Sequence, residues 1–282
     1  METIKHKEFE GERPLYASHD LHIDHVTIHV GESSLKESRN IKATNCTFEG
    51  KYTLWCVHGF EVDHCLFTPT ARSSTWYSSD MIMTNTKQLA PKMFRDSWNL
   101  KLDNVDMPDA QETFWNCHHI DIHNSRIANA DYLFMHSHNI RISDYHQDGN
   151  YSFQYARNVE IHHAIINSKD SFWNAENVTV YDSEINGEYM AWHSKNVTFV
   201  RCHLTGTQPL CYAENLKLID CTLGADADLA FEYSSVEATI KGRVVSIKNP
   251  TTGHIIADEI GEIILDQNQR APKDCVIETR NK

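Results

Sequence analysis

Aromatic and hydrogen-bonding side chains recur together along this chain at a spacing of about twenty residues. Five of the six tryptophans fall in one such column, and the residue after each position of that column is often Asn, His, Tyr or a carboxylate. Rings stack on planar or hydroxylated ligands and the polar groups hydrogen-bond to them, so the combination is typical of a glycan or small-molecule site. The candidate ligand-binding residues are Arg95, Trp115, Asn116, His136, Tyr155, Trp173, Asn174, Trp192 and His193.

Carboxylates on or beside these columns are the candidates for catalysis. An inverting glycosidase separates its two carboxyl groups by about 6.5 to 9.5 Å, which is two turns of a repeat that stacks at about 4.8 Å. Asp131 and Asp170 would have that separation. A polysaccharide hydrolase or lyase is therefore an alternative to a binding protein. The candidate acids are Asp96, Glu112, Asp131, Asp170 and Glu188.

Two other arrangements would explain the same tryptophans. Tryptophan is mostly buried in folded proteins, so the rings would fill a wide cross-section or lie under a terminal segment. Rows of aromatic side chains also occur at protein interfaces, which leaves a homodimer or another self-associating assembly as an alternative. The sequence leaves a core, an interface and a ligand-binding surface open.

A further row of polar residues alternates in charge between neighbouring units. Opposite charges on adjacent strands pair favourably, so a ladder of ion pairs is expected. His163 between two carboxylates, with His146 and His162 nearby, leaves a metal site or a general base as the alternative. The 18 histidines follow no fixed ligand spacing and there is no Gly-rich phosphate loop, so neither a metal nor a cofactor is expected. The row comprises Asn124, Asp144, His163, Asp182, Arg201 and Asp220.

The eight cysteines follow the repeat and form no CxxC motif. Cys46 and Cys65 fall in one inward column on consecutive coils, as do Cys202 and Cys221, so each pair is expected within disulfide reach. In a reducing compartment they stay packed thiols, and no cysteine nucleophile is expected.

These columns require a repeated backbone unit. The segments ENVTVYDSEI, KNVTFVRCHL and ENLKLIDCTL share one order of Asn, apolar, any and apolar residues, and eleven such units follow one another at spacings of 19 to 21 residues. The first apolar residue of each unit is called the marker below. The markers are Leu21, Ile41, Phe60, Met81, Leu100, Ile120, Ile140, Val159, Val178, Val197 and Leu216.

Each unit is expected to form short strands. The marker and the residue two positions later alternate with polar neighbours, which is the period of a strand with one buried face. Only about 11 or 12 residues separate the last apolar column from the next marker, which is too short for the helix of a leucine-rich repeat. The sequence therefore predicts an all-β fold, a single-stranded parallel β-helix of about 11 or more coils.

Amides occupy most positions just before the markers. Stacked amides donate to one coil and accept from the next, which predicts an internal asparagine ladder that satisfies the buried turns. The column comprises Asn40, Asp80, Asn99, His119, Asn139, Asn158, Asn177, Asn196 and Asn215.

The repeat predicts one β-helix domain over residues 1–282. Residues 1–20 are expected to form an N-terminal cap, residues 21–235 the regular coils, and residues 236–282 irregular final coils with a C-terminal cap. Caps are expected because an open end would expose unpaired strand edges.

Composition narrows the partners. The chain has 26 basic and 39 acidic residues, a balance of −13, which repels phosphate backbones and argues against a nucleic-acid partner. No apolar run approaches the roughly 18 residues of a membrane helix, and no apolar signal segment opens the sequence. We therefore expect a cytoplasmic protein without a membrane partner.

Several segments, which include turns that do not repeat, resemble a known family. RSSTWYSSD, PKMFRDS, QETFWNC and KNPTTGHIIADEIGE are similar to a bacterial family carried only as a domain of unknown function. The resemblance spans essentially the whole chain and implies a right-handed parallel β-helix of the pectin-lyase-like group. That group includes polysaccharide lyases and hydrolases, but the family supplies no catalytic residues, and fold does not imply function.

Overall fold

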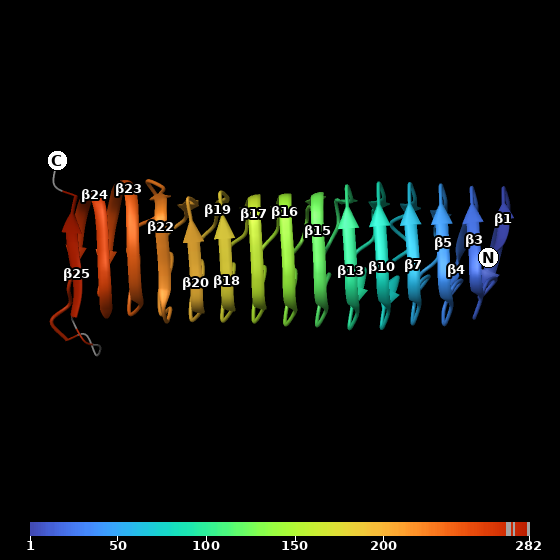
Figure 1. The fold of residues 1–282 in the computed structure, drawn as a ribbon, viewed down its shortest axis with the longest axis horizontal. Helices are drawn as coiled ribbons and strands as arrows, with labels where there is room; N and C mark the ends of the chain where they lie inside the picture. The colour runs from blue at the N-terminus through green and yellow to red at the C-terminus, as the bar shows by residue number, and fades with distance from the viewer. Residues whose placement is uncertain (269–271, 273, 281–282) are drawn as a thin grey trace. The chain divides into compact units, whose positions relative to one another are not determined.

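The computed structural model describes residues 1–268, 272 and 274–280, and every regular element in this part of the chain is a β-strand. The chain divides into two compact units, unit 1 (Met1–His146) and unit 2 (Gln147–Lys282). In both units successive strands lie side by side in order of sequence, as the colour gradient of Figure 1 shows.

Unit 1 is wound from one strand row that contains the markers and a second row that follows it. All pairings between successive coils are parallel. The marker row comprises β1 (Glu2–Lys5), β3 (His19–Asp24), β5 (Arg39–Thr44), β7 (His58–Asp63), β10 (Ser79–Thr84), β13 (Trp98–Asp103) and β15 (His118–Ile127). The second row comprises β2 (Glu8–Glu12), β4 (Thr27–Glu32), β6 (Thr47–Phe48), β8 (Leu66–Phe67), β11 (Lys87–Gln88) and β14 (Asp106–Met107), and the short strands β9 (Thr75–Trp76) and β12 (Phe94–Arg95) pair separately.

Unit 2, taken by itself, is wound in the same way, with longer strands near its end. β16 (His138–Asp148) crosses the division between the units. The strands of unit 2 are β17 (Arg157–Asn167), β18 (Glu176–Tyr181), β19 (Glu184–Asn186), β20 (Lys195–Val200), β21 (His203–Thr205), β22 (Leu216–Leu223), β23 (Ser235–Lys248), β24 (Thr252–Ile264) and β25 (Asp274–Thr279).

The register confirms the predicted repeat. Leu21 pairs with Ile41, Ile41 with Phe60 and Leu100 with Ile120 in unit 1, and in unit 2 the marker of β17 pairs with that of β18. The all-β parallel β-helix is therefore confirmed. Residues 1–20, expected as a cap, contain β1 and β2, which pair with the next coil, and residues 236–280 continue in β23 to β25.

The core contains stacked phenylalanines, one from each of three successive coils in unit 1 and one from each of two successive coils in unit 2. Phe94, Phe114 and Phe134 are fully buried with ring centroids 4.6 and 4.9 Å apart in unit 1. Phe153 and Phe172 repeat the arrangement in unit 2 at 4.9 Å. Each buried ring stabilises the fold by roughly 1.5 to 3 kcal/mol.

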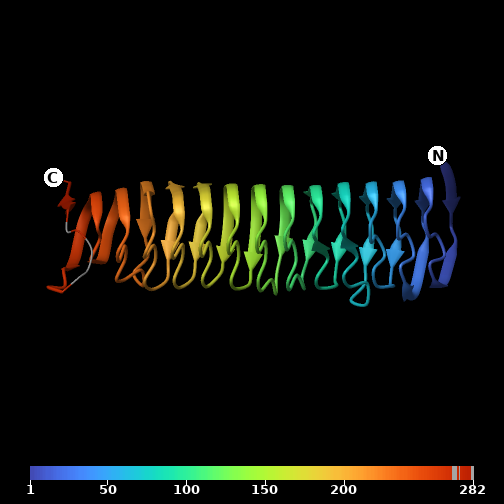
Figure 2. The same cartoon turned by 90° about the horizontal axis from the view of Figure 1, so that it is seen from below.

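The bends between strands use left-handed backbone, which explains their composition. Asn85, between β10 and β11, has φ of 49°, and Asn177 and Asn196, the second residues of β18 and β20, have φ of 58° and 54° at the bends where these strands begin. Asn, Asp and His adopt this region more readily than other residues with a side chain. Figure 2 shows these bends between the strands.

The asparagine column does not lie inside the helix, so that part of the prediction is wrong. The Nδ2 of Asn196 donates to Oδ1 of Asn177 at 2.9 Å, but the pair lies at the surface. Buried turn amides are instead satisfied by serine hydroxyls. Ser137 Oγ accepts from the backbone N–H of Cys117 at 2.9 Å, and Ser78 Oγ does the same for Val57 at 3.0 Å.

Candidate functional site

A tight turn places the aromatic residues of each coil. In unit 2 the backbone N–H of Ala175 donates to the carbonyl of Phe172 at 3.0 Å, and Asn174 between them has φ of 51°. The turn points Phe172 inward and leaves both Trp173 and Asn174 half-buried. We call the half-buried positions, five before each marker, the tryptophan column. Among them are Trp55, Trp76, Arg95 and Trp115 in unit 1 and Gln154, Trp173 and Trp192 in unit 2.

In the tryptophan column of unit 1, an arginine lies between two indole rings. The guanidinium carbon of Arg95 lies 4.3 Å from the ring centroid of Trp76 and 4.5 Å from that of Trp115. Trp76 also stacks on Trp55 at 5.0 Å. Glu112 Oε2 contacts Arg95 at 3.6 Å and Lys92 Nζ at 2.9 Å. The ring faces and the carboxylate are thus occupied by the protein itself.

Indole N–H groups in both units are also used internally. Trp76 donates to the carbonyl of Lys92 at 2.8 Å, Trp115 to that of Tyr132 at 2.6 Å and Trp192 to that of Gln208 at 2.7 Å. Each bond joins a ring to the next coil and fixes its orientation. Within the described residues the indole N–H of Trp173 has no such partner.

The tryptophan column of unit 2 continues into a row of other rings. The centroids of Trp173 and Trp192 are 5.5 Å apart, and the edge of Trp192 meets Tyr212 at 5.0 Å. His193 stacks on Tyr212 at 4.9 Å, and Tyr233 follows at 5.7 Å. We call these five residues the unit 2 aromatic row. Burial, together with the charge of Glu232, raises the pKa of the Tyr212 hydroxyl.

The sequence-based site is therefore divided. Arg95, Trp115 and Asn116 come together in unit 1, where Asn116 donates to Asp96 and His136 is exposed in a following coil. Trp173, Asn174, Trp192 and His193 come together in unit 2, where Tyr155 is 45% exposed.

The candidate acids are also divided between the units, with Asp131 in unit 1 and Asp170 in unit 2. Asp96 accepts from Asn116, and Glu112 is held by Lys92 and Arg95. Glu188 lies 3.6 Å from Lys169 Nζ. These contacts account for three of the five acids as structural groups.

Asp170 differs from the other acids. It is only 8% exposed, and its carboxylate has no hydrogen-bond or ion-pair partner in the described part of the chain. Burial raises the pKa of Asp170, Glu188 adds to the rise and Lys169 opposes it.

Sequence reasoning missed a second row in unit 1. Trp98 stacks on His118 at 5.9 Å, and His118 on His138 at 5.0 Å. Burial and the neighbouring histidines lower the pKa of His118. These residues share the column two before the marker, which is the signal that could have revealed them.

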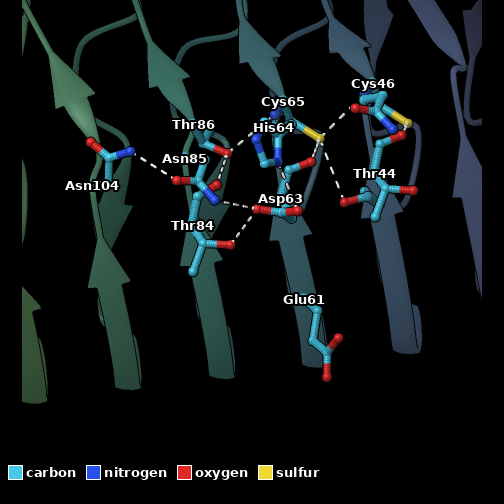
Figure 3. Close-up of polar contacts among 12 residues, drawn as sticks. Thr44, Cys46, Glu61, Asp63, His64, Cys65, Thr84, Asn85, Thr86 and Asn104 are labelled. Carbon is cyan, nitrogen blue, oxygen red and sulfur yellow. Dashed lines mark hydrogen bonds and ion pairs between the residues drawn. The ribbon is translucent and has the colours of Figure 1, made fainter.

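Polar side chains three and four residues after the marker form hydrogen bonds between adjacent coils. Asp63 accepts from Thr84 at 2.6 Å and from Asn85 at 2.8 Å, and Asn104 donates to Asn85, as Figure 3 shows. Burial opposes ionisation of Asp63, but these bonds and His64 outweigh it and lower its pKa to about 2. In unit 2 Arg201 forms two bonds of 2.7 Å with Asp182.

The cysteines of successive coils lie next to one another as free thiols. Cys46 and Cys65 lie in adjacent coils, with the N–H of Cys46 3.4 Å from Cys65 Sγ, and all eight thiols are free. Burial raises the pKa of Cys117 to about 12, which keeps that thiol protonated. In the described residues no group of three or more His, Cys, Asp or Glu side chains is arranged to hold a metal ion.

A groove lies at the C-terminal edge of unit 2. Ile256, Ile260, Ile263, Ile277 and Arg280 line it, and Ile263 is 46% exposed. β25 pairs with β24 only over Thr252–Ala257, so the rest of β24 borders the groove. No tryptophan lines the groove, so it is separate from the interface expected along the tryptophan column.

In the part of the chain that the structure describes, no helix has the length and apolar character needed to cross a membrane.

Several solved structures and one protein family are similar to this chain. No curated protein matches the sequence. Among solved structures, the surface adhesin PfbA of Streptococcus pneumoniae is similar at 10% identity and a TM-score of 0.38, covering 93% of this chain and 73% of the adhesin.

Two further structures are similar over most of this chain. The tailspike protein of the E. coli bacteriophage HK620 has 12% identity and a TM-score of 0.46, covering 93% of this chain but only 62% of the tailspike. The A-module of the mannuronan C-5 epimerase AlgE6 of Azotobacter vinelandii has 10% identity and a TM-score of 0.33, covering 100% and 91%. Residues 2–278 match the family described as protein of unknown function (DUF3737), and the chain belongs to this family.

Proposed function

We propose that this protein binds a carbohydrate, and that the unit 2 aromatic row is its binding surface. The observation that supports this is a contiguous set of rings, Trp173, Trp192, His193, Tyr212 and Tyr233, with unpaired polar groups beside it. Asn174 and the indole N–H of Trp173 have no hydrogen-bond partner within the described residues. Sugars offer C–H faces to rings and hydroxyls to such groups.

The internal stacking changes how the rings would serve a ligand. Most ring faces in both columns are covered by neighbouring rings, so a sugar would contact ring edges and the exposed imidazole of His193. Polar groups along the row would then set orientation. This favours a shallow surface for an extended oligosaccharide over a deep pocket.

The test is a panel of oligosaccharides measured by thermal shift and by tryptophan fluorescence on the full chain. Binding to the folded state must raise the melting temperature. We expect Trp192→Ala to abolish the shift and Trp55→Ala, which removes a stacked ring from unit 1, to leave it intact. Absence of any shift across the panel, or equal loss in both variants, would overturn the proposal.

The same samples address the enzymatic alternative. New reducing ends or unsaturated products from a bound oligosaccharide would establish a hydrolase or lyase, and Asp170→Asn would then be the first variant to examine for loss of product. Saturable binding without product supports a binding protein.

A further inference from the structure

The repeat provides an internal comparison for Asp170. In unit 1 the carboxylate eight positions before a marker belongs to Glu112, and the tryptophan-column residue of the preceding coil is Arg95, 3.6 Å away. Asp170 holds the same position in unit 2, and the corresponding residue of its preceding coil is Gln154. Adjacent coils bring these positions together, since the N–H of Tyr155 donates to the carbonyl of Trp173 at 2.9 Å.

The difference leaves a carboxylate without its counter-ion. Glu112 has two cationic partners, Arg95 and Lys92, whereas Gln154 offers Asp170 only a neutral amide. Lys169, the next residue before it in the chain, lowers the pKa of Asp170, but its ammonium is 3.6 Å from Glu188 and lies over the ring of Tyr189 at 5.4 Å. A mostly buried carboxylate without a partner is unfavourable even where solvent still reaches it, and a cation that binds it relieves this.

Aromatic side chains complete the environment. Trp173 has the same relation to Gln154 that Trp115 has to Arg95, where the guanidinium lies 4.5 Å from the ring. A cation near Asp170 would therefore gain a ring face as well as a carboxylate. Glu188 adds negative charge beside it.

We infer that the Asp170 site binds a cationic group of the ligand, an ammonium carried by an amino sugar, in the place that the Arg95 guanidinium takes in unit 1. This inference rests on the proposed carbohydrate binding and names its ligand class. A protonated amine would donate to the carboxylate while the sugar rings follow the unit 2 aromatic row.

The experiment compares a glucosamine oligosaccharide with its fully N-acetylated counterpart of the same length, by calorimetry at neutral pH. We expect the amino form to bind roughly tenfold more tightly, as a charged hydrogen bond allows. Asp170→Asn should remove that preference and keep binding of the acetylated form. Glu237→Gln, which removes one exposed negative charge elsewhere in unit 2, should keep the preference.

A second variant supplies Asp170 with a counter-ion from the protein itself. Gln154→Arg recreates the Arg95 and Glu112 pair, so it should raise the melting temperature and abolish the preference for the amino form. Because this variant is expected to be more stable, loss of the preference cannot be assigned to misfolding.

The outcomes separate the two proposals. Binding of neither oligosaccharide, nor of any other glycan in the panel, overturns the proposed function and this inference with it. Equal binding of both forms overturns only the inference, and it is the result expected if Lys169 turns to neutralise Asp170. An unchanged preference in Asp170→Asn overturns the inference as well.

Discussion

In unit 1 the guanidinium of Arg95 lies between the indoles of Trp76 and Trp115, whereas in unit 2 the same position of the repeat is held by Gln154. The two residues hold the same position in the repeat, so the difference between the units lies in the side chain. In unit 1 the charged Arg95 pairs with Glu112 and covers two indole rings. In unit 2 the neutral Gln154 gives Asp170 no counter-ion.

The comparison indicates which positions of a repeat protein are candidates for ligand binding. Residues that complete each other between coils stabilise the stack and offer little to a ligand. A position that breaks the pattern without a replacement partner, as at Asp170, marks a candidate site. The predictions below test whether the units share a core and differ only in these columns.

The largest effect should come from the core, and it should be equal in both units. Phe114→Ala and Phe172→Ala each remove a buried ring from the phenylalanine stack, which should lower the free energy of unfolding by about 3 to 5 kcal/mol. Urea unfolding of the full chain measures this. A cost below about 1 kcal/mol in only one unit would contradict the equivalence of the cores.

The next largest effect on stability is expected for Arg95, whose guanidinium lies between two indoles of the unit 1 tryptophan column. Arg95→Gln removes two ring contacts and a partner of Glu112, and should cost about 2 kcal/mol. Gln154→Ala, its counterpart in unit 2, should change stability by less than about 0.5 kcal/mol. Similar losses in the two variants would show that the columns do not differ as described.

A smaller effect separates two tryptophans of unit 2. Trp192→Phe loses the hydrogen bond to the Gln208 carbonyl and should cost about 1 kcal/mol. Trp173→Phe loses an N–H without a described partner and should cost close to nothing beyond the change in ring size. Thermal unfolding of both variants is the measurement, and a larger loss for Trp173→Phe would contradict the assignment of its N–H as available.

The smallest expected effect is on the pH dependence of stability, to which Asp63 and Asp170 should contribute with opposite signs. Asp63 in unit 1 has its pKa lowered to about 2, so its stabilising contribution is present above the ordinary pKa and is lost as the pH falls toward 2. The pKa of Asp170 is raised, so its unfavourable contribution is absent at low pH and grows as the pH rises through the folded pKa. Because both sites contact solvent, we expect only a few tenths of a kcal/mol.

Stability curves from pH 2 to 7 would resolve the two signs. Relative to the parent protein, Asp63→Asn should be less stable at pH 7, and Asp170→Asn more stable. Both differences should shrink as the pH falls. If both variants shift in the same direction at pH 7, the contrast between a partnered and an unpartnered carboxylate is wrong.

Much of the fold could be predicted because residues about nineteen apart touch. The register of Val159 with Val178, and the inward stack of Phe114 and Phe134, follow from that spacing alone. The asparagine column was misplaced because αL bends and buried ladders both favour Asn. The sequence pattern did not separate a surface corner from an interior one, and serine hydroxyls such as Ser137 serve the interior.

Less of the site could be predicted. The sequence identified the tryptophan column and Asp170, but whether ring faces are covered depends on rotamers of neighbouring coils, such as Arg95 lying between two indoles. The row of Trp98, His118 and His138 was missed because only one of its members is a tryptophan.

The sequence by itself determined the period, the strands and the residues that share a column, because one-face burial leaves an alternating pattern in the chain. Only the tertiary structure decided which side chains in a column satisfy one another. That depends on distances of a few ångströms between side chains on adjacent coils, and at this range Arg95 finds Glu112 whereas Asp170 finds no counter-ion within the described residues.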